Sequence, residues 1–172
     1  MRSYPVYGID FLKKSSLQIH IDGAARGNPG PAGAGIHIAD GSGRKIRELA
    51  VFLGEATNNV AETCALILAL QTVLQMGYSR ARVLTDSELL ARQVSGLYRV
   101  KDQRLQWLHA LIRNLQQGFE SLEVESIPRE KNRKADRLAN QAVTEALRKK
   151  PVRRRKSSVV SPEVLEKQPS LF

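Results

Sequence analysis

Four carboxylates stand out because the sequence places each one at the end of a predicted strand or at the start of a predicted helix. Asp22 and Asp86 follow apolar strand patterns, and Glu62 and Asp136 fall in the first turns of two helical patterns. Sites in open α/β sheets gather outside the carboxyl ends of parallel strands, so these acids can converge. Converging carboxylates repel one another and suit hard, oxygen-liganded cations such as Mg²⁺. The four acids therefore predict a divalent-metal site that could activate water for phosphoryl displacement.

Three of these acids also have ordinary structural explanations. Asn59 and Glu62 fit a capping box at the start of a helix. Asp86 or Ser87 could cap the following helix, and Asp136 could interact with the positive end of its helix dipole. The first of the four acids has no such explanation, because no helix follows it. On residue patterns alone, both interpretations stay open.

The periodicity of apolar residues predicts the element order βββαβααβα. We expect strands over 17–22, 35–40, 45–54, 81–86 and 121–127, and helices over 59–76, 87–96, 101–117 and 132–148. Three successive strands joined by turns indicate an antiparallel meander. The whole pattern indicates one α/β domain, a mixed sheet with helices packed on it.

The composition bounds the class of protein. The chain has 172 residues, 42% of them hydrophobic, which is enough for one domain with a sizeable core. No apolar run is long enough to span a membrane. A single cysteine, Cys64, excludes an internal disulfide and suits a reducing cytoplasm; we expect it in the core. The net charge of +10 favours a polyanionic partner such as nucleic acid, although a solubilising surface gives the same charge.

The segment "IDGAARGNPGPAGAG" at 21–35 is almost bare of side chains. We interpret its middle as a loop between the first two strands. Bare residues directly after Asp22 would let backbone groups approach a ligand closely. A tight corner between two strands would need the same residues, so the segment alone does not decide between the two.

Four segments together resemble the ribonuclease HI family: "IDGAARGNPGPAGAG", "TNNVAE", "LTDSELL" and "REKNRKADRLAN". They occur in the family's order and cover roughly residues 17–147. The resemblance implies the ribonuclease H-like fold, with a five-stranded mixed sheet of order 3-2-1-4-5. It also implies an endonuclease that cleaves the RNA strand of RNA–DNA hybrids with two Mg²⁺ or Mn²⁺ ions, leaving 5′-phosphate and 3′-hydroxyl ends.

The resemblance also assigns roles to residues. It makes the four acids the catalytic metal ligands: Asp22, Glu62, Asp86 and Asp136. It makes six further residues contacts for the hybrid: Gly23, Ala24, Asn28, Thr57, Asn58 and Asn59. The two adjacent asparagines could equally be helix caps.

The chain departs from the family in two places. Many members carry a histidine before the last acid; here Arg129 lies in that neighbourhood, either neutralising a phosphate or as a plain surface residue. Many members also insert a basic, tryptophan-bearing helix, but between Ser95 and Gln106 there is room only for a turn. We expect Trp107, in the next helix, to lie in the core. The basic residues at 148–156 could anchor phosphates instead, or form a solvated tail.

The sequence divides into an extension over 1–16, a ribonuclease H domain over 17–148 and a basic tail over 149–172 that we expect to be disordered. The tail ends in "QPSLF", which resembles the bacterial sliding-clamp-binding pentapeptide through Gln168, Leu171 and Phe172. Two apolar side chains at the end of a tail indicate a partner, although so short a motif can arise by chance. We expect a cytoplasmic monomer.

Two other functions stay open from the sequence. One is a catalytically silent module that binds RNA–DNA hybrids or double-stranded RNA on the same fold. The intact set of four acids argues against it, because a binder of polyanions gains nothing from converging negative charge. The other is a detached reverse-transcriptase nuclease domain.

Overall fold

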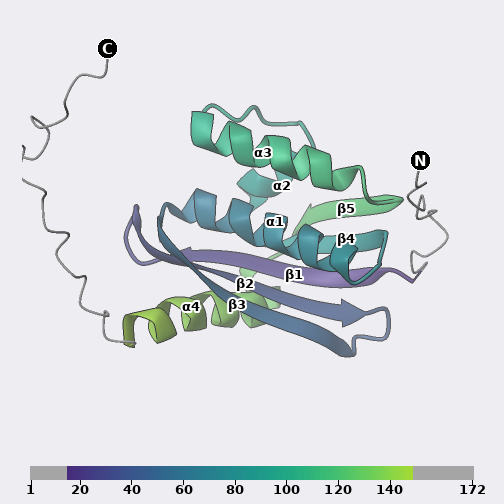
Figure 1. Ribbon diagram of the computed structural model, residues 1–172, viewed down its shortest axis with the longest axis horizontal. Coiled ribbons are helices and arrows are strands. Elements are labelled where there is room, and N and C mark those ends of the chain that lie inside the picture. The colour runs from purple at the N-terminus through teal and green to yellow at the C-terminus, as the bar shows by residue number, and fades with distance from the viewer. Residues whose placement is uncertain (1–14, 149–172) are drawn as a thin grey trace, which may run out of the picture.

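A computed structural model of the chain describes residues 15–148. Its centre is a five-stranded mixed sheet whose strand order, β3-β2-β1-β4-β5, confirms the predicted order (Figure 1). The strands are β1 Leu17–Ala25, β2 Gly30–Asp40, β3 Lys45–Ala56, β4 Arg80–Thr85 and β5 Ser121–Ser126. The helices are α1 Asn58–Gln75, α2 Glu88–Val94, α3 Gln103–Gln116 and α4 Arg133–Arg148, with a 3₁₀ turn η2 at Arg129–Lys131.

The sheet combines a meander with two parallel pairs. β1 pairs with β2 and β2 pairs with β3, both antiparallel. β4 lies parallel to β1 on one side and to β5 on the other. Because β1 and β4 run in the same direction, Asp22 and Asp86 approach each other from neighbouring strands, as the sequence analysis required.

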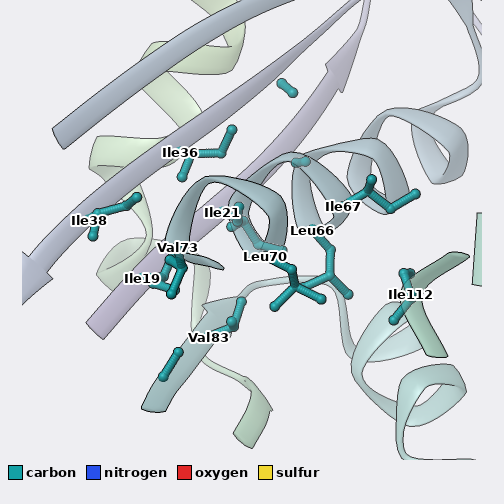
Figure 2. Close-up of a cluster of buried hydrophobic side chains, with 14 of the residues drawn as sticks. Ile19, Ile21, Ile36, Ile38, Leu66, Ile67, Leu70, Val73, Val83 and Ile112 are labelled. Carbon is teal, nitrogen blue, oxygen red and sulfur yellow. The ribbon is translucent and has the colours of Figure 1, made fainter. Parts of the chain in front are cut away.

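Helices cover both faces of the sheet. α1 packs against β1 and β2 and is itself covered by α3, whereas α4 lies on the opposite face against β1, β2 and β3 (Figure 1). The main core lies between the sheet and α1 (Figure 2). Isoleucines at alternate strand positions meet α1 there: Ile19, Ile21, Ile36 and Ile38. The side chains between them in sequence, such as Asp22, point to the α4 face because strand side chains alternate.

The bare segment is mostly strand, so the predicted loop between the first two strands is present but covers only residues 26–29 instead of 23–34. β1 continues through Asp22 to Ala25, and β2 already begins at Gly30. Asp22 therefore lies within a strand, opposite Gly35, rather than at its end. Glycine and alanine have low strand propensity, which hid the pairing in the sequence.

Helix α1 begins one residue earlier than predicted, with a different cap. The side chain of Thr57 accepts a hydrogen bond from the backbone N–H of Val60, which makes Thr57 the N-cap. The capping box of Asn59 and Glu62 is therefore wrong, because Glu62 lies beyond the first turn. The Glu62 carboxylate therefore does not cap the free backbone N–H groups at the start of α1. At α2, the predicted cap is confirmed as Ser87.

The predicted burial of α3 is partly wrong. Leu105 and Ile112 are buried, but the Trp107 residue is 72% exposed and Leu111 is 43% exposed. The polar residue His109 of α3 is also buried. Cys64 is only half-buried.

Some predictions fall outside the part of the chain that the structure describes. They are the extension before residue 15 and the tail after residue 148, including Gln168, Leu171 and Phe172. Within residues 15–148, no helix has the length and apolarity needed to cross a bilayer.

Candidate active site

The four predicted acids line a single pocket of about 260 Å³, which we call the acidic pocket. Asp22 reaches it from β1, Glu62 from α1, Asp86 from the end of β4, and Asp136 from the first turn of α4. The remaining lining residues are Gly23, Ala24, Ala25, Asn58, Arg129 and Asn140. The acids come from four separate elements, so only the tertiary fold brings them together.

Two glycines of the bare segment let helices carry acids into the acidic pocket. A Cβ atom on Gly23 would lie 2.1 Å from the backbone nitrogen of Glu62, so the start of α1 can pack flush against β1. A Cβ atom on Gly35 would lie 2.1 Å from the carbonyl oxygen of Ala135, next to Asp136. Any larger residue would push these helices away. The space that Gly23 leaves is filled by α1, so packing explains this glycine.

Asp22 carries the strongest electrostatic signature of the site. It is only 8% exposed. Burial raises its pKa to about 8, and the negative charges of the other three acids add to the rise. The backbone N–H of Gly23 opposes this shift without cancelling it. Asp22 therefore resists ionisation chiefly because it is buried and additionally because three carboxylates lie near it, and a bound cation would offset both effects.

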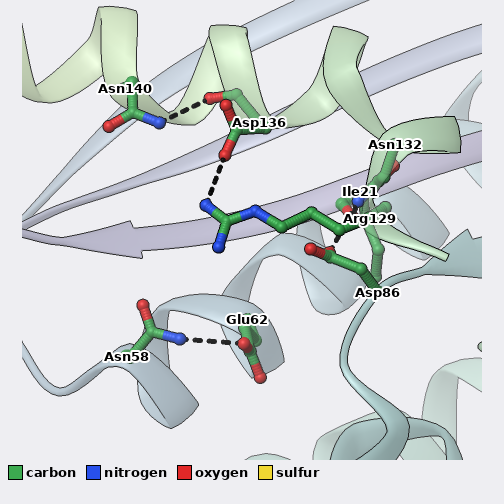
Figure 3. Close-up of polar contacts among 8 residues, drawn as sticks. All are labelled: Ile21, Asn58, Glu62, Asp86, Arg129, Asn132, Asp136 and Asn140. Carbon is green, nitrogen blue, oxygen red and sulfur yellow. Dashed lines mark hydrogen bonds and ion pairs between the residues drawn. The ribbon is translucent and has the colours of Figure 1, made fainter.

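Glu62 is held in place by two neutral donors. The side-chain amide of Asn58 donates to its Oε1 at 2.8 Å, and the hydroxyl of Ser87 donates to its Oε2. Burial raises the pKa of Glu62, and these two hydrogen bonds oppose the rise. Asn58 therefore uses its side chain to orient an acid (Figure 3).

Arg129 reaches from the η2 turn into the space between the acids. Its Nη2 lies 3.2 Å from Oδ1 of Asp136, and its guanidinium lies between that acid and the Asp86–Glu62 side of the pocket (Figure 3). The hydrogen bond and charge of Asp136 raise the pKa of Arg129, with further contributions from Asp86 and Asp22. The positive charge of the Arg129 guanidinium thus partly neutralises the acidic pocket.

Asn132 is a residue of this site that the sequence analysis missed. It is fully buried, and its side-chain amide donates to Oδ1 of Asp86 at 2.8 Å and to the carbonyl oxygen of Ile21 at 2.9 Å. The backbone carbonyl oxygen of Asn132 accepts a hydrogen bond from the backbone N–H of Asp136 at 3.2 Å. Its position, four residues before Asp136 at a helix start, was the available signal.

The donor chemistry of the acidic pocket fits a hard divalent cation. All four side chains offer carboxylate oxygens, and the repulsion among them adds to the raised pKa of Asp22. Within residues 15–148, however, no three acidic, histidine or cysteine side chains are grouped closely enough to hold an ion as they lie. Arg129 stands between them, so ion binding requires the side chains to close in.

The predicted hybrid contacts divide between two neighbouring surfaces. Gly23, Ala24 and Asn58 line the acidic pocket. The others line a larger groove of about 840 Å³ between the start of α1 and the start of α3: Asn28, Thr57 and Asn59. Trp107 and Arg104 line its α3 side, and we call it the Trp107 groove. The Oδ1 atom of Asn28 accepts from the backbone N–H of Asn58 at 3.2 Å, which ties the two surfaces together.

Comparison with known proteins supports the same family. A family model described as reverse transcriptase-like matches residues 20–142. Ribonuclease HI of Halobacterium salinarum is 38% identical over 130 residues, 76% of this chain and 65% of that protein. A bifunctional protein of Mycobacterium tuberculosis is 42% identical over 130 residues, 74% of this chain and 35% of that protein. The chain thus spans less than two thirds of the length of these curated relatives.

This chain matches two solved structures over almost their entire length. The crystal structure of RNase H1 from Halobacterium salinarum has a TM-score of 0.74 at 36% identity, covering 76% of this chain and 98% of that one. LC11-RNase H1 in complex with an RNA/DNA hybrid has a TM-score of 0.73 at 43% identity, covering 76% and 99%. With the strand order and the matched region, these similarities show that the chain belongs to the ribonuclease HI family.

Proposed function

We propose that this protein is an endoribonuclease that hydrolyses the RNA strand of RNA–DNA hybrids. The observation that carries the proposal is the convergence of four carboxylates from four elements on one pocket, where burial and mutual repulsion raise the pKa of Asp22. A structural neighbour with 43% identity is a complex with an RNA/DNA hybrid, which supports the same substrate class.

The acidic pocket would hold two Mg²⁺ ions, or Mn²⁺ in their place, through Asp22, Glu62, Asp86 and Asp136. Bound ions of this kind generate a nucleophilic hydroxide from water and stabilise the leaving oxygen, which would leave 5′-phosphate and 3′-hydroxyl ends. The protein's own contribution is orientation. Asn58 and Ser87 fix both oxygens of Glu62, and Asn132 fixes one oxygen of Asp86.

Arg129 replaces the histidine found in many family members, and we assign it to the phosphate. A guanidinium stays protonated near neutral pH, so it cannot act as a base, but it can neutralise a phosphate oxygen. In the structure its charge is directed at Asp136. It would have to turn from that carboxylate to the scissile or product phosphate.

The backbone of Gly23 and Ala24 would read the RNA strand beside the acids. The 2′-hydroxyl is the group that distinguishes RNA from DNA, and it can both donate to and accept from backbone groups. Both residues line the acidic pocket. Asn28 and Asn59 line the neighbouring Trp107 groove and would contact the duplex beyond the cleavage point.

The Trp107 groove would receive the DNA strand. It adjoins the acidic pocket across Asn58, so a duplex over the acids extends into it. Trp107 offers a flat apolar ring, and Arg104 offers a charge for phosphate. A deoxyribose can pack against an indole without burying a hydroxyl, whereas a ribose would leave its 2′-hydroxyl without a partner. The groove therefore suits DNA better than RNA.

Cleavage of a labelled hybrid with Mg²⁺ or with EDTA tests the proposal. We expect RNA fragments with Mg²⁺ and none with EDTA, and no product from a DNA duplex of the same sequence. Hybrid binding without any product, in either Mg²⁺ or Mn²⁺, would instead favour the catalytically silent binding module.

The C-terminal "QPSLF" supports a second, separate proposal, that the tail docks on a bacterial sliding clamp. Leu171 and Phe172 would enter an apolar pocket while Gln168 hydrogen-bonds at its rim. Deleting residues 168–172 should abolish clamp binding in a pull-down with purified clamp and leave hybrid cleavage unchanged. Equal clamp binding by the truncated protein would refute this docking.

The cytoplasmic location and monomeric state stay predictions, which fractionation and light scattering can check.

A further inference from the structure

Asn132 makes contacts with three of the four segments that carry the acids. Its amide bonds to Asp86 itself and to the carbonyl of Ile21, the residue before Asp22. Its backbone carbonyl accepts from the N–H of Asp136 and so begins helix α4. Asn132 thus joins β1 and the end of β4 through its side chain, and the start of α4 through its backbone.

The chemistry of the amide fixes its orientation. A side-chain amide nitrogen carries two hydrogens, and both are used on acceptors, one on Ile21 and one on Asp86. Rotating the amide by half a turn would place its oxygen against two acceptors, which would repel it. The amide oxygen lies near the His20 imidazole, whose lowered pKa the Asn132 side chain opposes, but it makes no hydrogen bond of good geometry, so the nitrogen's two contacts decide the arrangement.

We infer that Asn132 is a positioning residue that orients the carboxylate of Asp86 for catalysis. An acid beside three other acids turns away from them unless something holds it. Asn132 holds one oxygen of Asp86 and leaves the other free to face the acidic pocket. Because the same amide is anchored to β1, the orientation of Asp86 is set relative to Asp22. This inference rests on the proposed nuclease function.

Asn132→Asp keeps the shape of the side chain and removes both donors, but it also adds a carboxylate beside Asp86. Asn132→Leu removes both donors without adding a charge, so the test uses both variants. Loss of a partner that orients a ligand of this kind costs roughly 10–100-fold in activity or metal affinity. We expect kcat for hybrid cleavage to fall in that range, with KM within about twofold. Calorimetry should show Mn²⁺ binding weakened by a similar factor.

Thr72→Val is the matched control. The Thr72 hydroxyl donates to the carbonyl of Leu68 at 2.6 Å, in the same helix as Glu62 but far along it. It is buried, and its loss also removes a buried hydrogen bond. We expect this variant to lose thermal stability while kcat and Mn²⁺ affinity stay unchanged. A general loss of stability is thereby separated from a loss of orientation.

A measurement on the unchanged protein covers the case in which Asn132→Asp does not fold. The side-chain amide protons of Asn132 should exchange slowly with solvent, and one of them should shift in NMR spectra when Mg²⁺ is added. If the folded variant keeps full kcat, or if neither amide proton responds to Mg²⁺, the inference is wrong. An inactive wild-type protein would instead refute the nuclease function itself.

Discussion

The acidic pocket and the Trp107 groove lie on opposite sides of the start of α1, and they are built on opposite principles. The pocket is small and polar, and its charges come from four separate elements. The groove is about three times larger and presents an exposed tryptophan. Under the proposed function, the contrast predicts that chemistry and duplex binding are separable. Changes in the pocket should act on turnover, and changes in the groove should act on affinity.

The largest expected effect is in the pocket, from Asp86→Asn. The substitution keeps the shape of the side chain but removes the charge that a cation needs. We expect hybrid cleavage to fall roughly a thousandfold or more, while hybrid affinity in a gel-shift assay stays within a few-fold. Undiminished turnover would remove Asp86 from the chemistry and with it the contrast between pocket and groove.

Asp22→Asn should change stability in a pH-dependent way when metal is chelated. The pKa of Asp22 is raised from 3.8 to about 8 in the folded protein, so the folded state holds a proton that the unfolded state has lost. Wild-type stability should therefore fall as pH rises from about 4 through about 8. The variant has no such group, so it should gain over the wild type by a few kcal/mol at high pH.

Thermal unfolding in EDTA at pH values of about 5 and about 9 measures this difference. The gap between the two proteins should widen with pH. Adding Mg²⁺ at the higher pH should stabilise the wild type more than the variant, because the ion offsets the charge of Asp22. A gap that is constant across pH would mean that Asp22 ionises normally.

The sequence predicted the convergence of the four acids better than the bounds of the first two strands. The four motifs identified Asp22, Glu62, Asp86 and Asp136, and the sheet order followed from the family resemblance. The strand pairing of the bare segment was hidden, because its glycines are there for α1 and α4, which come later in the chain. A local pattern does not contain the position of a distant helix.

Trp107 and Asn132 show two different reasons for a missed residue. Leu105 and Ile112 already define the buried side of α3, and Trp107 lies on the other side, so the helical period alone could have predicted its exposure. The role of Asn132 depends on Asp86 and Ile21, which lie 46 and 111 residues away in sequence. No spacing rule could have found those contacts.

Trp107→Ala sharpens the comparison from the groove side. Removing an aromatic contact with a nucleotide costs roughly 1–3 kcal/mol, or about fivefold to 150-fold in affinity. We expect KM for the hybrid to rise by that factor, with kcat within about twofold. Leu111→Ala is the control, because Leu111 is also exposed on α3 but does not line the groove. An equal loss in both variants would mean that α3 acts through stability and not through contact.

The smallest expected effect is at Arg129, which pairs with Asp136 in the acidic pocket and which we propose can turn to a phosphate. Its side chain is largely exposed, so its pairing with Asp136 should add little to stability. Arg129→Ala should leave the midpoint of thermal unfolding unchanged and lower kcat only a few-fold. Arg129→Lys keeps the positive charge but loses the planar guanidinium, so its kcat should lie between those of the wild type and Arg129→Ala.

The Mg²⁺ requirement separates the two possible roles of Arg129. If the guanidinium competes with cations for Asp136, Arg129→Ala should reach half-maximal activity at a lower Mg²⁺ concentration than the wild type, because a positive charge has been removed from the acids. If Arg129 acts only on the phosphate, kcat falls and the Mg²⁺ requirement stays the same. The direction of that one shift therefore decides whether the residue that replaces the family's histidine works on the metal side or on the substrate side.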